Sequence, residues 1–501
     1  MLKKNVIYNY IGQFYNSFIG ILIFPLYLKY IGGEAYGLIG FFMLLQAWML
    51  LFDLGMSPTL ARQVAISKIG EGTSNELRSL LRSLETVFLI IALVIFILMF
   101  SIKGSIASKW LNVSSLDIND VAICIALMGA MISLRWFASL YKSGINGYER
   151  QAWVNVFNIA VVTFRMPFSL IIIFLFKNSI VAYFVYQFLV SIFEVYFLNR
   201  KMYVCLPEKE KAPIPIFSWQ VLSYVLPFAA STAYTAGIWV FLTQLDKLLL
   251  SKILPLNVFG YFSMIATLVG GILMLSTPVS NALLPRMTNL LSRGYEGEML
   301  ELYRMATRFI CCVVSPISLA ICFFPFLIMF VWTGNSEASS WAVSILPQYA
   351  IGNAILAIVG FQYYLQYAHG KLKLHVLYNS ILALISIPAV YFSAIKFGAI
   401  GTGFVWLIFN MMTMFFWTAL VHKKFAPGLH KKWIFFDVFI PILPSLMIFI
   451  LLWAVFKHNS FTRVEGGGFI ILSCIISFAI SIAVAFYSKI IAFLKFKMRK
   501  K

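Results

Sequence analysis

The sequence predicts an all-helical polytopic membrane protein with about fourteen transmembrane helices. The chain has 501 residues, of which 61% are hydrophobic and 11% are charged, whereas a soluble domain carries about 25% charged residues. About fourteen apolar segments of roughly 25 residues follow one another along the chain. These segments are uninterrupted, which excludes the alternating strands of about ten residues that build an outer-membrane barrel.

Each apolar segment is long enough to cross a bilayer as one helix. The first follows Lys3 and Lys4 and has no small-residue cleavage site, so we expect an uncleaved first span. The fourteen predicted spans cover residues 5–30, 36–64, 84–106, 118–142, 153–176, 180–200, 219–250, 257–285, 305–330, 342–368, 373–393, 399–421, 434–456 and 468–490.

The distribution of basic residues predicts the orientation. The chain has 39 Lys and Arg against 18 Asp and Glu, for a net charge of +21. With the N-terminus inside, 28 of the basic residues lie in connections on that side, 9 lie on the other side and two lie within spans. Because Lys and Arg concentrate in cytoplasmic loops, we expect both termini in the cytoplasm. The positive charge is thereby explained without a nucleic-acid partner.

A repeat relates the two halves of the sequence. Tyr36-Gly37 closes the first outside turn, and Phe259-Gly260 occupies the equivalent place 223 residues later. Each turn leads into a span that ends near a proline and an arginine. Six spans separate the copies, which predicts a parallel repeat about an axis along the membrane normal, with a cleft between the halves. Chance similarity between apolar segments is the alternative.

This repeat predicts four parts of the chain. A proline-containing charged stretch is the best linker candidate, and the last two spans fall outside the repeat. We expect an N-terminal six-helix lobe at 1–203, a cytoplasmic linker at 204–218, a C-terminal six-helix lobe at 219–424, and two extra transmembrane helices with a basic tail at 425–501.

Polar residues inside apolar spans indicate helix faces turned toward protein or water, because they are costly in lipid. The first and fifth spans carry amides at helical spacing. Such amides line a cavity or cement helix–helix contacts, and both interpretations stay open. The cavity candidates are Asn5, Asn9, Asn16, Asn155 and Asn158.

Two arginines lie within predicted spans. Arg165 has twelve residues of its span before it and eleven after, so it lies near the midplane and either faces a water-filled cavity or pairs with Asp53 or another carboxylate. Arg135 lies about two turns from the cytoplasmic end and either joins that cavity or extends to the headgroups. We expect Lys142 to extend to the headgroups and Glu194 to be solvated.

Other polar features give little sign of an enzyme. The chain has no GxxxxGK[ST] motif, no metal-ligand spacing and no paired acidic motif in an outside loop, so we expect no catalytic residue, metal or cofactor. Asp53 and Asp246 are placed to bind a coupling cation. Pairing with a basic residue, such as Asp246 with Lys247, is the alternative.

Several motifs follow one another in a fixed order along the chain. They are Asn5-x3-Asn9, Pro25 with Lys29-Tyr-Ile-Gly-Gly-Glu34-Ala-Tyr36-Gly37, Asp53-Leu-Gly55 with Arg62, YKSGINGYERQ from Tyr141 and LDKLLLSKILPLNVFGYFSM from Leu245. Together they resemble the Wzx-type polysaccharide-biosynthesis flippases of the multidrug/oligosaccharidyl-lipid/polysaccharide (MOP) exporter superfamily. No single motif is specific, but their order and spacing cover most of the chain.

The resemblance implies a bacterial inner-membrane carrier of two six-helix lobes. It would move an undecaprenyl-pyrophosphate-linked oligosaccharide repeat unit, for O-antigen or another surface polysaccharide, to the outer leaflet by alternating access. Its partners would be that substrate, membrane lipids, and a polymerase or other polysaccharide-assembly proteins. The family pattern does not assign Arg165 and Arg135 to the pyrophosphate; their depth and their planar, permanent charge do.

Two other functions remain open. A small-molecule drug antiporter of the same superfamily would offer carboxylates to organic cations, whereas the deep charges here include two arginines. A membrane enzyme of the same pathway, such as a polymerase or acyltransferase, would need catalytic side chains in outside loops.

Overall fold

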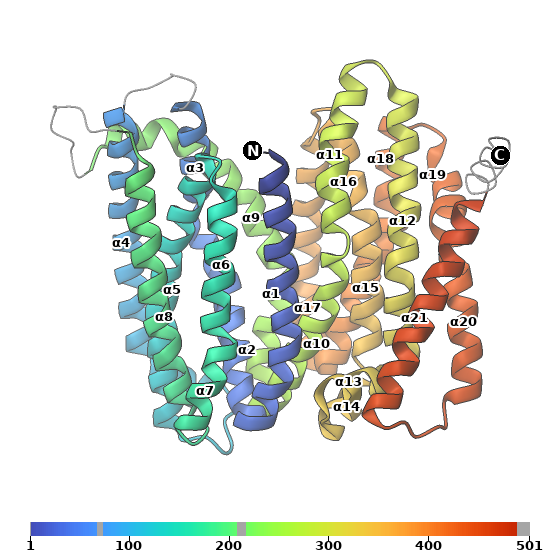
Figure 1. The fold of residues 1–501 in the computed structure, drawn as a ribbon, viewed down its shortest axis with the longest axis horizontal. Coiled ribbons are helices and arrows are strands. Elements are labelled where there is room, and N and C mark those ends of the chain that lie inside the picture. The colour runs from blue at the N-terminus through green and yellow to red at the C-terminus, as the bar shows by residue number, and fades with distance from the viewer. Residues whose placement is uncertain (1, 68–73, 208–216, 488–501) are drawn as a thin grey trace. The chain divides into compact units, whose positions relative to one another are not determined.

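Helices joined by short connections make up the part of the chain that the structure describes. The computed structural model describes residues 2–67, 74–207 and 217–487 (Figure 1). Among these residues, eleven helices are long and apolar enough to span a membrane, or twelve if one bent pair counts as a span. The all-helical polytopic class is confirmed, although fewer candidate spans are found than the fourteen expected.

Two features account for the lower count. The stretch Lys373–Phe425 counts once although it has 53 residues, which would make a straight helix of about 80 Å against a hydrocarbon core of about 30 Å. It is broken at Gly398, where φ is 57°. The search is limited to the described residues, and near the N-terminus it finds Phe18–Ile31 as a shorter apolar helix. The count of fourteen therefore stays a prediction.

The contacts between residues divide the chain into a first unit, Met1–Gly260, and a second unit, Tyr261–Lys501. The predicted lobe boundaries stay predictions, and residues 208–216 of the expected linker lie outside the described residues. The helices of the first unit are α1 (Leu2–Ile31), α2 (Gly33–Met49), η1 (Leu50–Asp53), α3 (Met56–Ser67), α4 (Ser74–Ser105), η2 (Ile106–Trp110), α5 (Ile118–Gly147), α6 (Gln151–Arg165), α7 (Pro167–Leu175), α8 (Ile180–Cys205), α9 (Trp219–Ile253) and the start of α10 (Leu256–Met274).

Helix α5 is the packing centre of the first unit, since α3, α4 and α8 all pack against it. Small residues permit these close approaches. A Cβ atom at Gly129 would lie 2.8 Å from Cβ of Met99 on α4. One at Gly144 would lie 2.6 Å from Sδ of Met202 on α8. This packing fixes the orientation of the α5 face that carries Arg135, Ser139 and Lys142.

The two turns related by the sequence repeat contact each other reciprocally. A Cβ atom at Gly37 would lie 2.1 Å from the carbonyl oxygen of Leu256, and one at Gly260 would lie 2.7 Å from the carbonyl oxygen of Gly33. An offset of 223 residues converts one contact into the other. Such mutual contacts are typical of residues near a two-fold axis.

The second unit is built around α12, against which α15, α20 and α21 pack. Asp437 is fully buried and pairs with Arg304 and Arg308 of α12 at 2.6 and 2.5 Å. Its helices are α11 (Thr277–Ser292), α12 (Glu296–Phe323), α13 (Pro325–Thr333), α14 (Ser336–Ala342), α15 (Leu346–Val359), α16 (Phe361–Ala368), α17 (Lys373–Met412), η3 (Thr413–Trp417), α18 (Thr418–Phe425), α19 (Leu429–Lys432), η4 (Trp433–Phe439), α20 (Ile440–Phe456) and α21 (Arg463–Ala485).

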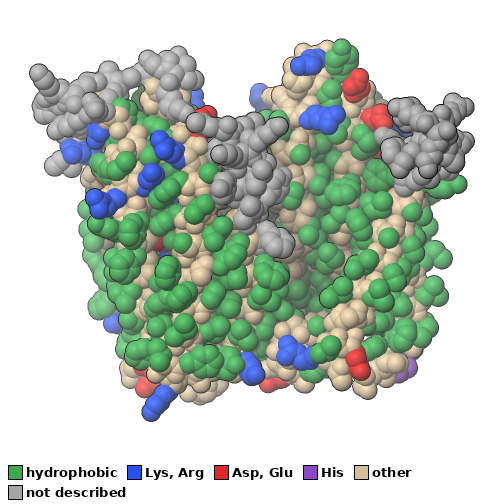
Figure 2. Space-filling model, viewed as in Figure 1, with side chains coloured by type: hydrophobic (Ala, Val, Ile, Leu, Met, Phe, Trp, Pro, Cys, Tyr) green, Lys and Arg blue, Asp and Glu red, His purple; other side chains and the backbone are tan. Residues whose placement is uncertain are grey.

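The surface of each unit is apolar over the middle of its helices. Hydrophobic side chains cover this region on the face shown in Figure 2, and Lys and Arg gather mostly toward the helix ends. On α4, for example, Ile90, Val94 and Ile97 are 57–61% exposed. A soluble protein rarely exposes so extensive an apolar surface, so this pattern agrees with a membrane environment.

Candidate functional site

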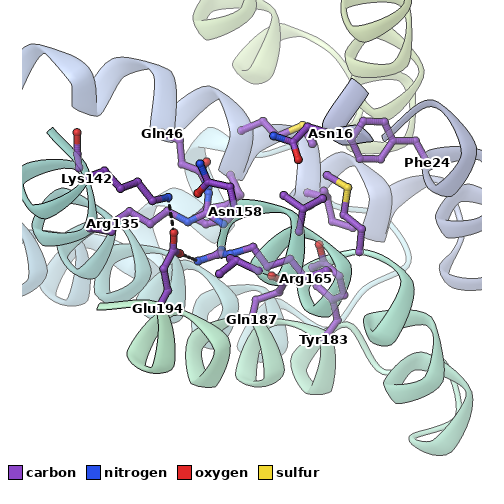
Figure 3. Close-up of a pocket in the computed structure, with 18 of the residues that line it drawn as sticks. Asn16, Phe24, Gln46, Arg135, Lys142, Asn158, Arg165, Tyr183, Gln187 and Glu194 are labelled. Carbon is purple, nitrogen blue, oxygen red and sulfur yellow. Dashed lines mark hydrogen bonds and ion pairs between the residues drawn. The ribbon is translucent and has the colours of Figure 1, made fainter. Parts of the chain in front are cut away.

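The first unit contains a polar cavity of about 550 Å³, lined by α1, α2, α5, α6 and α8 (Figure 3). Each helix contributes side chains from one face. Its polar and charged lining residues include Asn16, Tyr27, Gln46, Arg135, Ser139, Lys142, Ser143, Asn158, Arg165, Tyr183, Gln187 and Glu194.

A break in the fifth predicted span positions Arg165. Proline lacks an N–H group and disturbs a helix, and α6 ends at Arg165, two residues before Pro167 begins α7. The carbonyl of Arg165 accepts a hydrogen bond from Nε2 of Gln187 at 2.6 Å, and that of Met166 accepts one from Tyr27 at 3.0 Å. Arg165 is thus held at a helix C-terminus, where a positive charge is favoured.

Glu194 joins two of the cavity cations. Its Oε2 lies 2.5 Å from Nη2 of Arg165 and its Oε1 lies 2.6 Å from Nζ of Lys142. Nη2 of Arg165 also donates to Ser191 at 3.1 Å. Glu194 is only 5% exposed, so the two cations compensate the cost of burying its charge.

Two arginine nitrogens in the cavity have no acceptor among the described residues and are available to a ligand. Nη1 of Arg165 and Nε of Arg135 are buried without a hydrogen-bond partner among the described residues. The guanidinium of Arg135 lies 5.0 Å from the ring centroid of Phe42, in a cation–π contact. Buried donors are normally hydrogen-bonded, so these atoms indicate a site that takes an acceptor.

The charges of the cavity favour an anion. Arg135, Lys142 and Arg165 supply three positive charges against the single carboxylate of Glu194 among the lining residues, which leaves a net charge of +2. Charges interact more strongly in a partly buried cavity than in water. Two guanidinium groups with free N–H edges suit the oxygens of a phosphate group.

The structure distributes the predicted amides among different surroundings. Asn16 and Asn158 line the cavity with Arg135 and Arg165. Asn155 instead packs against α1, where a Cβ atom at Gly12 would lie 3.0 Å from its Oδ1. For Asn155, therefore, the helix-contact interpretation describes the observed geometry. The side chains of Asn5 and Asn9 lie outside the described residues.

The candidate carboxylates for ion coupling do not line this cavity. Asp53 accepts hydrogen bonds from the backbone N–H and hydroxyl of Ser57, at the start of α3. It is therefore not the partner of Arg165. Asp246 lies 3.7 Å from Nζ of Lys247, which also donates to the carbonyl of Thr243 at 2.5 Å.

Two expectations about the cavity residues are wrong. Glu194 is buried and ion-paired rather than solvated, and Lys142 turns to Glu194 rather than to the headgroups. The interpretation relied on their distance from the span ends, although Lys142 shares one helix face with Arg135. Tyr183, Gln187, Ser191 and Glu194 recur every three or four residues along α8, and this polar stripe could have located them.

The chain is similar to known proteins both in sequence and in fold. The family model of the polysaccharide biosynthesis proteins matches residues 2–291. A Shigella flexneri protein named "Putative O-antigen transporter" is 20% identical over 416 residues, which cover 81% of this chain and 94% of that protein.

Solved structures with the same fold include the lipid II flippase MurJ in an inward closed conformation. It has a TM-score of 0.76 at 16% identity, covering 97% of this chain and 100% of that chain. An inward-facing multidrug resistance MATE family transporter of the MOP superfamily has a TM-score of 0.66 at 13% identity, covering 83% of this chain and 96% of that chain. The fold is therefore that of the MOP superfamily. These relatives are transporters and flippases rather than enzymes.

Proposed function

The chain belongs to the polysaccharide biosynthesis protein family, and from this premise we propose that it is a flippase for lipid-linked glycans. Its substrate would be an undecaprenyl-pyrophosphate-linked oligosaccharide repeat unit, of O-antigen or another surface polysaccharide. The protein would move it from the cytoplasmic to the outer leaflet of the bacterial inner membrane. The observation that carries the proposal is the cationic cavity around Arg165.

The cavity suits the pyrophosphate group, which is the part of this substrate that lipid rejects. A pyrophosphate that carries two negative charges would balance the net charge of +2 on the lining residues. Nη1 of Arg165 and Nε of Arg135 would donate to its oxygens. Each such charge-assisted hydrogen bond contributes about 1.5–3 kcal/mol. The amides of Asn16 and Asn158 would contact the neighbouring sugar.

We also propose fourteen spans with both termini in the cytoplasm, arranged as two six-helix lobes and two extra helices, which open alternately to the two sides. The excess of Lys and Arg in one set of connections supports the orientation. The reciprocal contacts of Gly37 and Gly260 support the repeat. Membrane lipids, a polymerase and other polysaccharide-assembly proteins would be its partners.

The drug antiporter is the weaker candidate, although the MATE structure shares the fold. A cavity with three cations repels the organic cations that such an antiporter would bind, and its single carboxylate, Glu194, is already paired twice.

Arg165→Ala tests the proposal in vesicles that contain the purified protein and a fluorescent lipid-linked oligosaccharide. We expect binding to weaken roughly 10- to 100-fold and flipping to fall to the protein-free rate. Arg165→Lys should restore part of the activity, because it keeps the charge but loses the planar fork. Arg200→Ala, on the exposed face of α8, is the matched control and should flip like the wild type. Full flipping by a correctly inserted Arg165→Ala protein would refute the proposal.

A further inference from the structure

Glu194 occupies the position that an anionic ligand of this cavity would take. Its two oxygens lie 2.5 and 2.6 Å from the nitrogens of Arg165 and Lys142, which come from α6 and α5. A phosphate group would seek the same donors, since carboxylate and phosphate oxygens both accept charge-assisted hydrogen bonds. Full engagement of both cations by a phosphate therefore requires Glu194 to withdraw.

An incoming phosphate would first bind the arginine N–H groups that have no acceptor among the described residues, and from there displace Glu194. Nη1 of Arg165 is buried and has no hydrogen-bond partner in the described part of the chain, and Arg165 itself is only 9% exposed. Nε of Arg135 is likewise unpartnered within the described residues. A phosphate can therefore contact Arg135 and the free edge of Arg165 while Glu194 still holds the other edge. The cations therefore remain paired with an anion throughout the exchange.

We propose that Glu194 is a tethered counter-anion that exchanges places with the substrate's pyrophosphate. This inference rests on the proposed function and extends it to the control of binding and release. Before substrate binds, Glu194 bridges Arg165 and Lys142 and neutralises part of their charge. When substrate enters, its oxygens replace those of Glu194. When Glu194 returns, it competes for the same nitrogens and speeds release.

The proposal gives Glu194 an effect on affinity opposite to that of a purely structural residue. Loss of a structural ion pair loosens the site and weakens ligand binding. Loss of a competing internal anion leaves Arg165 and Lys142 free for the ligand and strengthens binding. Because release then becomes slow, the same change lowers the flipping rate. Affinity and turnover should therefore move in opposite directions.

Glu194→Gln in lipid nanodiscs tests this, with undecaprenyl pyrophosphate as the ligand and the flipping rate measured in vesicles. We expect binding about tenfold tighter than that of the wild type, together with slower flipping. Glu465→Gln is the matched control, because Glu465 belongs to the exposed capping box of α21, where glutamine also serves. It should leave both quantities unchanged.

A second comparison covers the case in which the unpaired cations prevent folding of Glu194→Gln. The double variant Lys142→Gln/Glu194→Gln removes one cation together with the anion, and so keeps the net charge of the cavity. It should bind the pyrophosphate more tightly than Lys142→Gln alone, in which Glu194 still competes for Arg165.

Weaker binding by folded Glu194→Gln, or no gain in the double variant over the single one, would overturn the inference while leaving the proposed function intact. If the wild type itself failed to bind undecaprenyl pyrophosphate, the proposed function would fall and the inference with it.

Discussion

At the scale of single residues, Arg135 differs from the other two cations of the cavity. Lys142 and Arg165 are ion-paired with Glu194, whereas Arg135 makes a cation–π contact with Phe42 and has no ion pair within the described residues. An unpaired arginine contributes little to holding the helices together. Its burial is better explained by a ligand that completes its hydrogen bonds.

Arg135→Gln should therefore impair binding without impairing the fold. We expect affinity for undecaprenyl pyrophosphate to fall about tenfold, which corresponds to one charge-assisted hydrogen bond, while the melting temperature in detergent changes little. Binding measurements and thermal unfolding on the same preparation check this. A large loss of thermal stability with unchanged affinity would instead make Arg135 a structural residue.

The sequence could predict the depth of a charged residue but not its partner. Arg135 and Arg165 were expected to line one cationic cavity between the two halves, whereas the structure places both on a cavity whose lining residues all belong to the first unit. Their depth follows from counting along a span. The partner of Arg165 depends on which face of α8 meets α6, and that is decided by packing between helices far apart in the chain. Glu194 was therefore overlooked.

At the scale of elements, the glycines of α5 determine the direction in which its cavity residues point. Gly129 and Gly144 allow α4 and α8 to approach closely, and this approach sets the direction of the face that carries Arg135 and Lys142. The sequence predicts α5 as one span, which the structure reproduces as Ile118–Gly147. The fifth span is different, because the break at Met166 and Pro167 makes two helices, α6 and α7, out of it.

Gly129→Ala should destabilise the protein by about 1–3 kcal/mol, because the added methyl group overlaps Cβ of Met99 close to the backbone of α4. Gly104→Ala on α4 is the matched control, since nothing lies within 4 Å of its added atom. We expect it to be neutral or slightly stabilising. Thermal unfolding of both variants in one detergent decides the matter. Equal melting temperatures would show that α4 and α5 are not closely packed at Gly129.

At the scale of the whole molecule, the contact between the two repeated turns supports the repeat better than their sequence similarity does. Apolar segments resemble one another by composition, so similarity alone cannot separate a repeat from chance. The pairs Gly37 with Leu256 and Gly260 with Gly33 exchange under one offset. A chance match of two turns would not place both copies in mutual contact. The break at Gly398 falls in the connection expected between the predicted spans 373–393 and 399–421, while the total of fourteen spans stays a prediction.

Flipping of a charged lipid-linked glycan in one direction requires a source of energy. No Walker-type nucleotide motif occurs in the sequence, and we expect the energy to come from the membrane potential acting on the substrate's charge. Two negative charges that move outward across an inside-negative membrane gain about 2.3 kcal/mol each per 100 mV, or about 4.6 kcal/mol together. The cations of the cavity are fixed to their helices, so they mask these charges without travelling the full distance with them.

We therefore expect an inside-negative potential to accelerate flipping in sealed vesicles severalfold, even without a proton or sodium gradient. A potassium-diffusion potential of either sign, imposed on the same vesicles, measures the effect and provides its own control, since the reversed potential should slow flipping. A rate that ignores the potential but follows a proton or sodium gradient would reject this source of energy. It would then favour antiport through a carboxylate such as Asp53 or Asp246, and substitution of each by asparagine would identify which one binds the ion.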